Sequence, residues 1–401
     1  MPETLLARRR ESLSPSYRLF YDEPLRPVRG EGVWLYEENG KACLDAYNNV
    51  VPAGHCHPRI VAAVAEQSAK LNTHTRYLHQ TILDYAEALL ATFPAMLNRA
   101  TFTCTGSEAN DLAIRIARYV TGGTGIIVTA NAYHGVSLAT AEISPSLGEA
   151  MPLGPHVRTV PAPAPGVDFA ASVRAAIRDL QRHGIKPALL VVDTIFSSDG
   201  VFADPPGFLA PAVEAIREAG GLFLADEVQP GFGRTGSAMW GFARHGLVPD
   251  MVSLGKPMGN GYPAAGLVAQ GRVIDEFGKN IRYFNTFGGN PVAMAAALAT
   301  LRVIQDEKLM ENAAATGAYL LDQLKTRPRL RAVRGAGLFI GAELAEGALA
   351  NQVVNNMRAR GVLISASGPA GNVLKIRPPL VFTQTHAEIL LAALDGALAD
   401  G

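Results

Sequence analysis

The sequence predicts an α/β protein whose mostly parallel sheet is covered by helices on both faces, together with a smaller α+β lobe. Between about residues 56 and 290, apolar runs of four to six residues alternate with helical stretches. Continuous apolar strands separated by helices are typical of a parallel sheet that is buried on both sides. A helix expected over 291–306 then leads into a differently arranged segment, which indicates the second lobe.

The N-terminal part carries a hairpin signal at residues 33–46, where two short alternating runs flank an Asn-Gly dipeptide. The strands expected in the large domain are 100–105, 125–130, 188–193, 222–226, 251–255 and 264–270, with amphipathic helices over 108–119 and 208–218. Strand-like segments follow at 338–344, 362–367 and 373–378. We therefore expect an N-terminal segment over 1–55, a large domain over 56–300 and a small domain over 301–401, with the hairpin joining the small domain.

Composition excludes several classes of function. Lys plus Arg equal Asp plus Glu at 36 each, so the chain lacks the basic excess of a general nucleic-acid binder. The three cysteines, Cys43, Cys56 and Cys104, are too scattered for a disulfide framework or a zinc site, and we expect no metal. With no secretory signal and no apolar run of about 18 residues, we expect a cytoplasmic protein that does not enter a membrane.

A G-x-G-x-x-G pattern at Gly231, Gly233 and Gly236 suggests a dinucleotide-binding loop. Such a loop leaves a strand and opens directly into a helix. Here four residues separate the strand from Gly231, and the segment that follows is poorly periodic. We therefore interpret these glycines as turn residues that need positive φ.

Asp226 and Lys256 each stand at the end of an apolar run. Asp226 closes the strand 222–226, at the edge where α/β sheets place ligand-contacting groups, and a buried carboxylate there needs a cationic partner. Lys256 follows the strand 251–255 among glycine and apolar neighbours, where a lysine can have a lowered pKa and act as an amine nucleophile. A solvated loop lysine is the alternative, but the pairing of the two residues on one sheet favours a chemical role.

Two further strand ends carry candidate ligand groups. Gly106 and Ser107 open an amphipathic helix that Ser107 can cap, which offers a phosphate cradle; an ordinary capped helix is the alternative. Tyr133 and His134 follow the strand 125–130, where the tyrosine could lie flat on a heteroaromatic ring or be a buried core aromatic. A phosphate cradle, an aromatic side chain, a carboxylate and a lysine at one sheet edge are what pyridoxal 5′-phosphate requires.

The segments ADEVQPGFGRTG, GKPMGNGYP, TGSEAND, AYHG and YFNTFGGNP resemble the class III (ω-) aminotransferases, which are fold-type I pyridoxal-phosphate enzymes with a seven-stranded type of sheet. The resemblance runs from GHCHP at 54–58 to RPPL at 377–380. It implies a PLP-dependent enzyme that moves an amino group from an amine or amino acid to a keto acid through a Lys256 Schiff base.

The resemblance also implies roles for individual residues. Asp226 would pair with the pyridinium nitrogen, Gln229 would contact the phenolic oxygen, and Tyr133, followed by His134, would stack on the ring. Gly106 and Ser107 would hold the cofactor phosphate with Thr286 of the partner subunit. The expected assembly is therefore a homodimer, with a tetramer as the larger alternative.

The chain departs from the family pattern at the substrate end. Many relatives carry a Glu-Pro pair and a carboxylate-binding arginine, whereas this chain has Asp193-Thr194 and Lys375, with Arg377 two residues later. A shorter acid and a lysine do not reproduce a bidentate clamp on an α-carboxylate, which argues against glutamate and 2-oxoglutarate as the exchange pair.

Segments such as 72–89 look most like the branch that contains alanine–glyoxylate-type aminotransferases and the ethanolamine-phosphate and hydroxylysine-phosphate phospho-lyases. The alternative activity is therefore elimination of phosphate from an amino-alcohol phosphate such as phosphoethanolamine. Candidate substrate residues are Asn48, Arg76, Asp193, Lys375 and Arg377, and His79 could join them in a second anion site; surface or interface ion pairs are the alternative for these charges. A silent scaffold relative and an NAD-linked dehydrogenase are disfavoured, because the cofactor residues are all present and only the glycine pattern supports the dehydrogenase.

Overall fold

The computed structural model describes residues 4–345 and 350–400. Its largest element is a seven-stranded sheet in the order β4-β10-β9-β8-β7-β5-β6. Only β10 runs against its neighbours, so the prediction of a mostly parallel sheet is confirmed. The strands are β4 (Leu97–Thr103), β5 (Gly125–Thr129), β6 (Val157–Val160), β7 (Pro187–Asp193), β8 (Leu222–Asp226), β9 (Met251–Leu254) and β10 (Ala265–Gln270).

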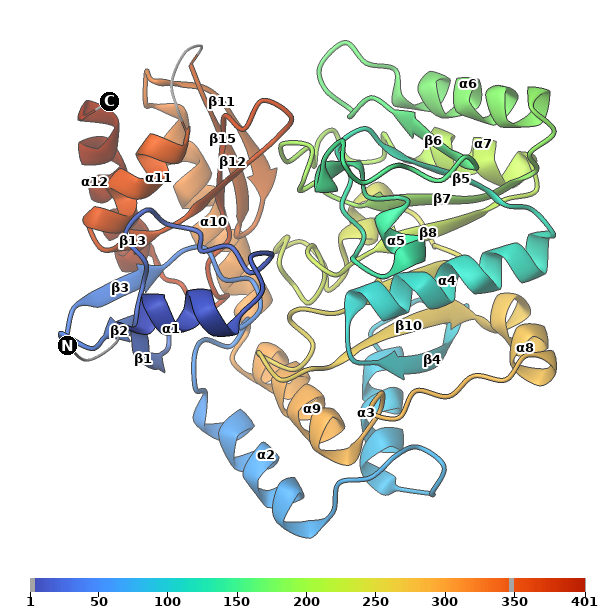
Figure 1. Ribbon diagram of the computed structural model, residues 1–401, viewed down its shortest axis with the longest axis horizontal. Helices are drawn as coiled ribbons and strands as arrows, with labels where there is room; N and C mark the ends of the chain where they lie inside the picture. Colours follow the sequence, from blue (N-terminus) through green and yellow to red (C-terminus); the bar gives the residue numbers. More distant parts are fainter. Residues whose placement is uncertain (1–3, 346–349, 401) are drawn as a thin grey trace.

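Helices cover both faces of this sheet (Figure 1). In β5, Ile126 and Val128 pack in the core that contains α4 (Gly106–Thr121) and α8 (Gly271–Asn280), whereas Ile127 packs in the core on the opposite face. That second face is covered by α6 (Phe169–Arg182), α7 (Ala210–Glu218) and α3 (Gln80–Leu90). Because successive side chains of a strand point to opposite faces, burial on both sides explains the unbroken apolar runs.

The smaller lobe lies beside the large sheet, at the left of Figure 1. Its antiparallel sheet has the order β11-β12-β15-β14, from β11 (Leu330–Ala336), β12 (Phe339–Leu344), β15 (Val373–Ile376) and β14 (Ser365–Ser367). The N-terminal hairpin of β2 (Trp34–Glu37) and β3 (Ala42–Asp45) extends through β13 (Val362–Leu363) and also carries β1 (Pro27–Glu31). The single expected strand at 362–367 is thus divided between two sheets.

The remaining helices connect and cover these layers. Asn290 caps α9 (Pro291–Asp306), whose bounds are those predicted, and α9 packs on α2 (Pro58–Lys70) and α3. The small lobe carries α10 (Leu309–Lys325), α11 (Ala350–Ala359) and α12 (Gln384–Ala399). The short elements are α5 (Leu138–Ala141), η1 (Pro145–Leu147) and η2 (Gly241–His245).

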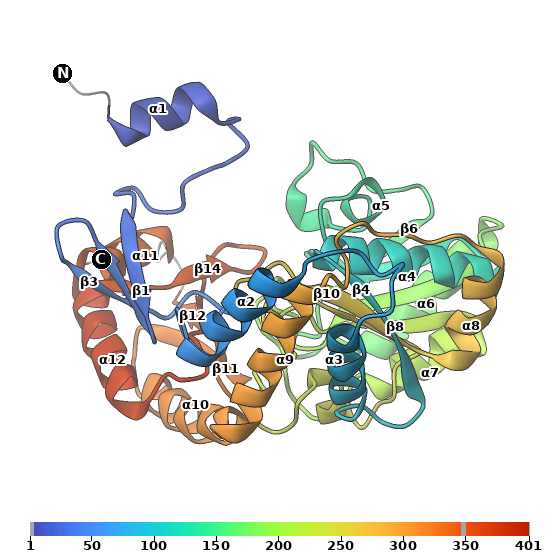
Figure 2. The same cartoon turned by 90° about the horizontal axis from the view of Figure 1, so that it is seen from below.

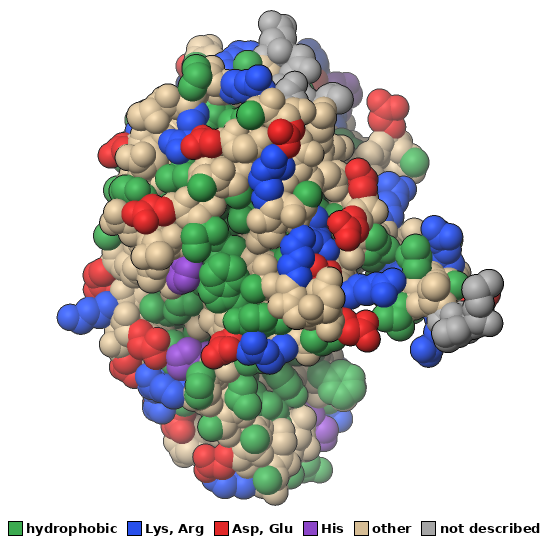
Figure 3. All heavy atoms as spheres, turned by 90° about the vertical axis from the view of Figure 1, so that its left-hand side faces the viewer, with side chains coloured by type: hydrophobic (Ala, Val, Ile, Leu, Met, Phe, Trp, Pro, Cys, Tyr) green, Lys and Arg blue, Asp and Glu red, His purple; other side chains and the backbone are tan. Residues whose placement is uncertain are grey.

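The N-terminal helix α1 (Leu5–Ser12) has no buried residue and stands away from the rest of the chain in Figure 2. Acidic and basic side chains are interspersed over the face shown in Figure 3, as the equal numbers of the two charges allow. No helix among the described residues is both long and apolar enough to cross a bilayer.

Candidate active site

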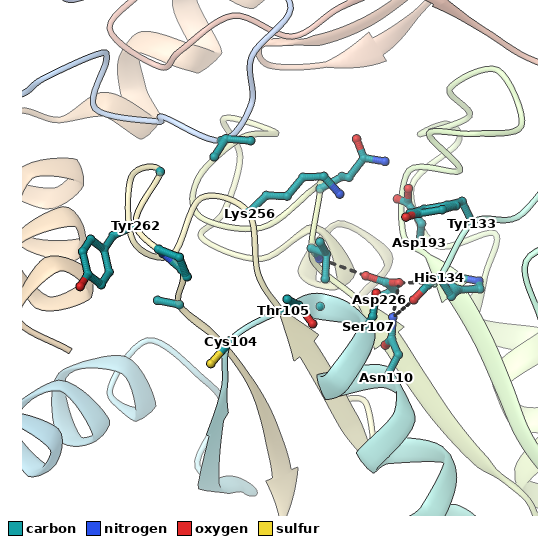
Figure 4. A pocket seen from close by; sticks show the side chains of 18 residues that line it. Cys104, Thr105, Ser107, Asn110, Tyr133, His134, Asp193, Asp226, Lys256 and Tyr262 are labelled. Atoms are coloured by element: carbon teal, nitrogen blue, oxygen red, sulfur yellow. Dashed lines mark hydrogen bonds and ion pairs between the residues drawn. The ribbon is translucent and has the colours of Figure 1, made fainter. Parts of the chain in front are cut away.

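A cavity of about 290 Å³ lies where β7, β8 and β9 end and α4 begins (Figure 4). The parallel register of β7 and β8 places Asp193 directly beside Asp226 at this edge. The predicted residues that line the cavity are Gly106, Ser107, Tyr133, His134, Asp193, Asp226, Gln229 and Lys256. Residues up to 150 positions apart in the chain therefore meet at one sheet edge.

Asp226 is buried and held by three donors. Its Oδ2 accepts hydrogen bonds from Asn110 Nδ2 at 2.9 Å and His134 Nδ1 at 2.8 Å, and its Oδ1 accepts from the Val228 amide at 3.1 Å. Burial alone would raise the pKa of this carboxyl, but the hydrogen bonds and charge of His134 outweigh it and the pKa is lowered. The site thus keeps a negative charge at the floor of the cavity.

Lys256 follows β9 and reaches into the cavity above Asp226 (Figure 4). Burial lowers the pKa of its ammonium and the positive charge of Arg377 lowers it further, while Asp226 and Asp193 act in the opposite direction. A lysine with a lowered pKa has more of the neutral amine that nucleophilic and proton-transfer chemistry needs. The alternative of a solvated loop lysine is therefore wrong.

The start of α4 differs from the expected cap. Thr105 is the N-cap and forms a capping box with Glu108, so the prediction that Ser107 caps this helix is wrong. The hydroxyl of Ser107 instead accepts a hydrogen bond from the Val136 amide at 3.1 Å. A Cβ at Gly106 would lie 2.8 Å from a Val228 methyl, so glycine is needed where α4 meets the loop after β8. The N–H groups of a first turn have no intrahelical partner and suit an anion.

Tyr133 is 37% exposed and lines the cavity on the side of Asp193, so the alternative of a buried core aromatic is wrong. His134 is buried beneath it, and its Nε2 has no hydrogen-bond partner among the described residues. Tyr133 thus forms an aromatic wall of the cavity, and His134 supplies one of the hydrogen bonds to Asp226.

The glycine pattern 231–236 opens no helix. Gly233 and Gly236 have φ of +76° and +74°, which confirms them as turn residues. Gly231 has no positive φ, and the expectation of a left-handed conformation there is wrong; a Cβ would instead lie 2.7 Å from the Glu227 carbonyl oxygen. Close approach of two backbone segments explains this glycine.

Gln229 connects the cavity to the small lobe. Its Oε1 accepts hydrogen bonds from Arg377 Nη1 at 2.6 Å and Asn49 Nδ2 at 3.2 Å, and its Nε2 donates to Ser197 Oγ at 2.6 Å. Sequence reasoning missed Asn49, Ser197 and Asn110. Nothing in their spacing singles them out, because each acts through a partner far away in the chain.

The predicted substrate residues do not all reach the cavity. Asn48 accepts a hydrogen bond from the Val50 amide within its own loop, and its neighbour Asn49 contacts Gln229 instead.

The predicted anion-site residues Arg76 and His79 have other contacts. Arg76 stacks on the Phe284 ring at 3.9 Å, and His79 caps α3. Arg76 and His79 are therefore not brought together with Lys375 and Arg377 within one chain.

Thr286 also lies outside the cavity of its own chain. It lines a separate surface hollow with Glu108, Arg115 and the aromatic Phe284. Thr286 is therefore not brought to the cavity of its own chain.

The residues of the cavity fit pyridoxal phosphate. Asp226 would hold the ring nitrogen, Lys256 the aldehyde carbon, and the start of α4 the phosphate, while Tyr133 offers an aromatic face. The observation that tests the fit is the buried Asp226 carboxylate, whose pKa is lowered. A buried ionised carboxylate is the group that would pair with a protonated ring nitrogen.

Residues 21–398 match the model of the class III aminotransferases. The chain belongs to the class III aminotransferase family.

Individual relatives agree. The chain is 37% identical to an alanine–glyoxylate aminotransferase 2-like protein of Drosophila melanogaster, over 96% of this chain and 84% of that one. It is 44% identical to a phospholyase from Arthrobacter solved in complex with phosphoethanolamine, with a TM-score of 0.96 over 99% of this chain and 100% of that one. An ornithine aminotransferase from Toxoplasma gondii is 26% identical, with a TM-score of 0.87 over 98% of this chain and 93% of that one, and its active site holds partly occupied PLP.

These findings confirm an enzyme of the class III aminotransferase family, fold-type I, with pyridoxal 5′-phosphate as its cofactor. Relatives named for amino transfer and for phosphate elimination both resemble this chain over nearly its whole length.

Proposed function

We propose that this class III aminotransferase-family enzyme eliminates phosphate from a small amino-alcohol phosphate such as phosphoethanolamine. The observation that carries the proposal is Lys375, a buried residue on β15 whose ammonium makes no hydrogen bond or ion pair with any residue in 4–345 or 350–400. Its Nζ lies 5.6 Å from the centroid of the Phe339 ring. A buried charge without an anionic partner is costly, so a ligand anion is the natural counterion.

Lys375 does not line the cavity, but its charge interacts with residues that do. Burial lowers the pKa of its ammonium well below the usual value and the charge of Arg377 lowers it further; Asp193 opposes these effects, and Lys256 adds to them. Of these neighbours, Asp193 and Lys256 line the cavity, and Arg377 contacts the lining residue Gln229. A lysine is a point-charge binder and suits a phosphate, which does not need a planar fork.

An α-carboxylate, by contrast, would lack its bidentate partner. No arginine is among the described residues that line the cavity. Arg377 does not line it; its Nη1 donates to Gln229 and its guanidinium lies 4.8 Å from the centroid of the Tyr47 ring. A cavity without a lining arginine favours a substrate without an α-carboxylate.

The side chains supply the steps of an elimination. When bound, pyridoxal phosphate supplies an electron-accepting ring that stabilises negative charge on the carbon bearing the amine. Lys256 takes a proton from that carbon, and the electron pair expels phosphate as the neighbouring C–O bond breaks. Lys375 offsets the charge of the departing phosphate. Protonation of the carbon that carried the phosphate gives an imine, and addition of water to its C=N bond releases an aldehyde and ammonia, without a keto acid.

Transfer of an amino group to a keto acid is the second candidate, favoured by the 37% identity to the alanine–glyoxylate aminotransferase 2-like relative. Both reactions begin with removal of the same proton by Lys256. The residues that would hold the cofactor therefore do not distinguish amino transfer from phosphate elimination.

We further propose a homodimer in which Thr286 of each subunit reaches the cofactor phosphate of the other. The position of Thr286 outside its own cavity supports this assembly. So do the exposed aromatic side chains in the same hollow, of which Phe284 is 42% and Phe287 69% exposed. Apolar groups of this size in one region are typical of a protein–protein interface.

The experiment compares two reactions of the purified holoenzyme. One arm contains phosphoethanolamine and no keto acid, and inorganic phosphate and ammonia are measured. The other arm contains a panel of amines with pyruvate, and keto-acid-dependent product is measured. Equal release of phosphate and ammonia supports elimination; product that appears only with pyruvate and no phosphate release would replace the proposal with transamination.

A further inference from the structure

Ser197 joins two groups that line the cavity. It lies just after β7 and its side chain is fully buried. Its hydroxyl accepts a hydrogen bond from Gln229 Nε2 at 2.6 Å and donates one to Asp193 Oδ2. The amide of Gln229 and the carboxylate of Asp193 are therefore connected through one buried oxygen.

The direction of this chain of hydrogen bonds is determined by Arg377. A guanidinium can only donate, so the atom of Gln229 at 2.6 Å from Arg377 Nη1 must be the amide oxygen. The amide nitrogen then faces Ser197 and donates to it, which leaves the hydroxyl proton for Asp193. The hydrogen bonds therefore all run in one direction, from Arg377 to Gln229, then to Ser197 and finally to Asp193.

We infer that Ser197 is a positioning residue, whose hydroxyl fixes the positions of Gln229 and Asp193 relative to each other. Asp193 has few other donors: its Oδ1 accepts from the Ile195 amide and its Oδ2 from the Ser197 amide, both at 3.1 Å. Without the hydroxyl, Asp193 loses its only side-chain donor among the described residues, and Gln229 Nε2 loses its buried acceptor.

The electrostatic surroundings of Asp193 give the direction of the effect. The pKa of this carboxyl is raised, chiefly by burial and also by Asp226, while the hydrogen bonds from the Ser197 hydroxyl and the Ile195 amide and the charge of Lys375 oppose the rise. Asp199 and Glu227 are the other acidic groups that interact with Asp193, and Lys256 is the other cation. Burial and the three acidic neighbours all raise the pKa of Asp193, and the Ser197 hydroxyl opposes them. Removal of the hydroxyl would therefore raise this pKa further, so that Asp193 keeps its proton up to a higher pH.

The test is Ser197→Ala in the full-length holoenzyme. The absorbance of the resting cofactor is titrated against pH, which requires no substrate and does not depend on which reaction the enzyme catalyses. We expect the acidic transition of this titration to move to higher pH by on the order of one unit. The acid limb of the pH profile of kcat/KM should move in the same direction, with kcat reduced about tenfold or more.

The neighbouring Ser198→Ala is the matched control, because the Ser198 hydroxyl makes no hydrogen bond with the described residues and only its carbonyl is used. It should leave both titrations unchanged. Ser197→Cys, which keeps the volume with a weak donor, serves if Ser197→Ala does not fold and should show the same shift. Melting curves identify a folding defect. A folded Ser197→Ala or Ser197→Cys enzyme with unshifted titrations would overturn the inference.

Discussion

Arg377 Nη1 donates a hydrogen bond to Gln229 Oε1 across 2.6 Å, from the residue after β15 to the loop after β8. This contact joins the small lobe to the wall of the cavity in the large domain. It fixes the orientation of the Gln229 amide, whose Nε2 then donates to Ser197.

Lys256→Ala should abolish the adduct that borohydride reduction traps between the protein and its cofactor, because Lys256 is the amine that lines the cavity beside Asp226. Activity should fall by about 10³-fold or more, since proton transfer by this lysine is lost as well. Mass spectrometry of the reduced protein checks the adduct. Lys279→Ala, at a side chain that is 71% exposed, is the control. An undiminished adduct in Lys256→Ala would refute the assigned role.

Asp226→Asn should reduce turnover by about 10²-fold or more while much of the cofactor binding is retained. The amide cannot balance a positive ring nitrogen, and it presents a donor to the Asn110 and His134 groups that now donate to Asp226. Steady-state rates and cofactor absorbance are measured on the same preparation. Full activity of this variant would mean that another group stabilises the ring nitrogen.

Lys375→Met should raise the KM for phosphoethanolamine about tenfold or more and change kcat less, because the substrate anion loses its counterion. In the parent enzyme, the lowered pKa of Lys375 means that the cation is lost as pH rises through that pKa. The KM should therefore increase with pH in the parent and stay flatter in Lys375→Met. Equal KM values at every pH would contradict binding of phosphate by this lysine.

Arg358→Met should destabilise the small lobe by about 3–5 kcal/mol, because it leaves a buried carboxylate without a partner. Arg358 Nη2 on α11 contacts both oxygens of Glu37, at 2.8 and 2.9 Å, and thus ties the N-terminal hairpin to the C-terminal part of the chain. Denaturant unfolding measures the loss. The double variant Glu37→Met/Arg358→Met should recover part of it, and a double variant as unstable as the sum of its singles would contradict direct pairing.

Phe287→Asp should convert the proposed dimer to monomers and reduce activity in proportion, because it places a charge in the exposed apolar region beside Thr286. Sedimentation velocity measures the assembly. Ile389→Asp, at a side chain on α12 that is 40% exposed, is the control and should leave both unchanged. A parent protein that sediments as a monomer with full activity would exclude the proposed exchange of Thr286.

Apolar periodicity located β7, β8 and β9 and the bounds of α9, because strand and helix formation depend on residues near one another in sequence. The same local signals placed Asp226 and Lys256 at strand ends, where a parallel sheet brings them together. The cap of α4 was misjudged by two residues, because Thr105 and Glu108 form a capping box and the Thr-x-x-Glu pattern was overlooked in favour of Ser107.

The sequence by itself thus determined the sheet, the cofactor and the position of Asp226 and Lys256 at one sheet edge, through patterns that each span a few residues. Only the tertiary structure decided that Lys375 faces the Phe339 ring and makes no ion pair within the described residues, that Arg377 donates to Gln229, and that Ser197 links Gln229 to Asp193. The physical reason is that a polar side chain is defined by the donor or acceptor it meets. Arg377 forms hydrogen bonds with Asn49, 328 positions away in the sequence, and with Gln229, 148 positions away. No pattern of neighbouring residues predicts contacts over such separations.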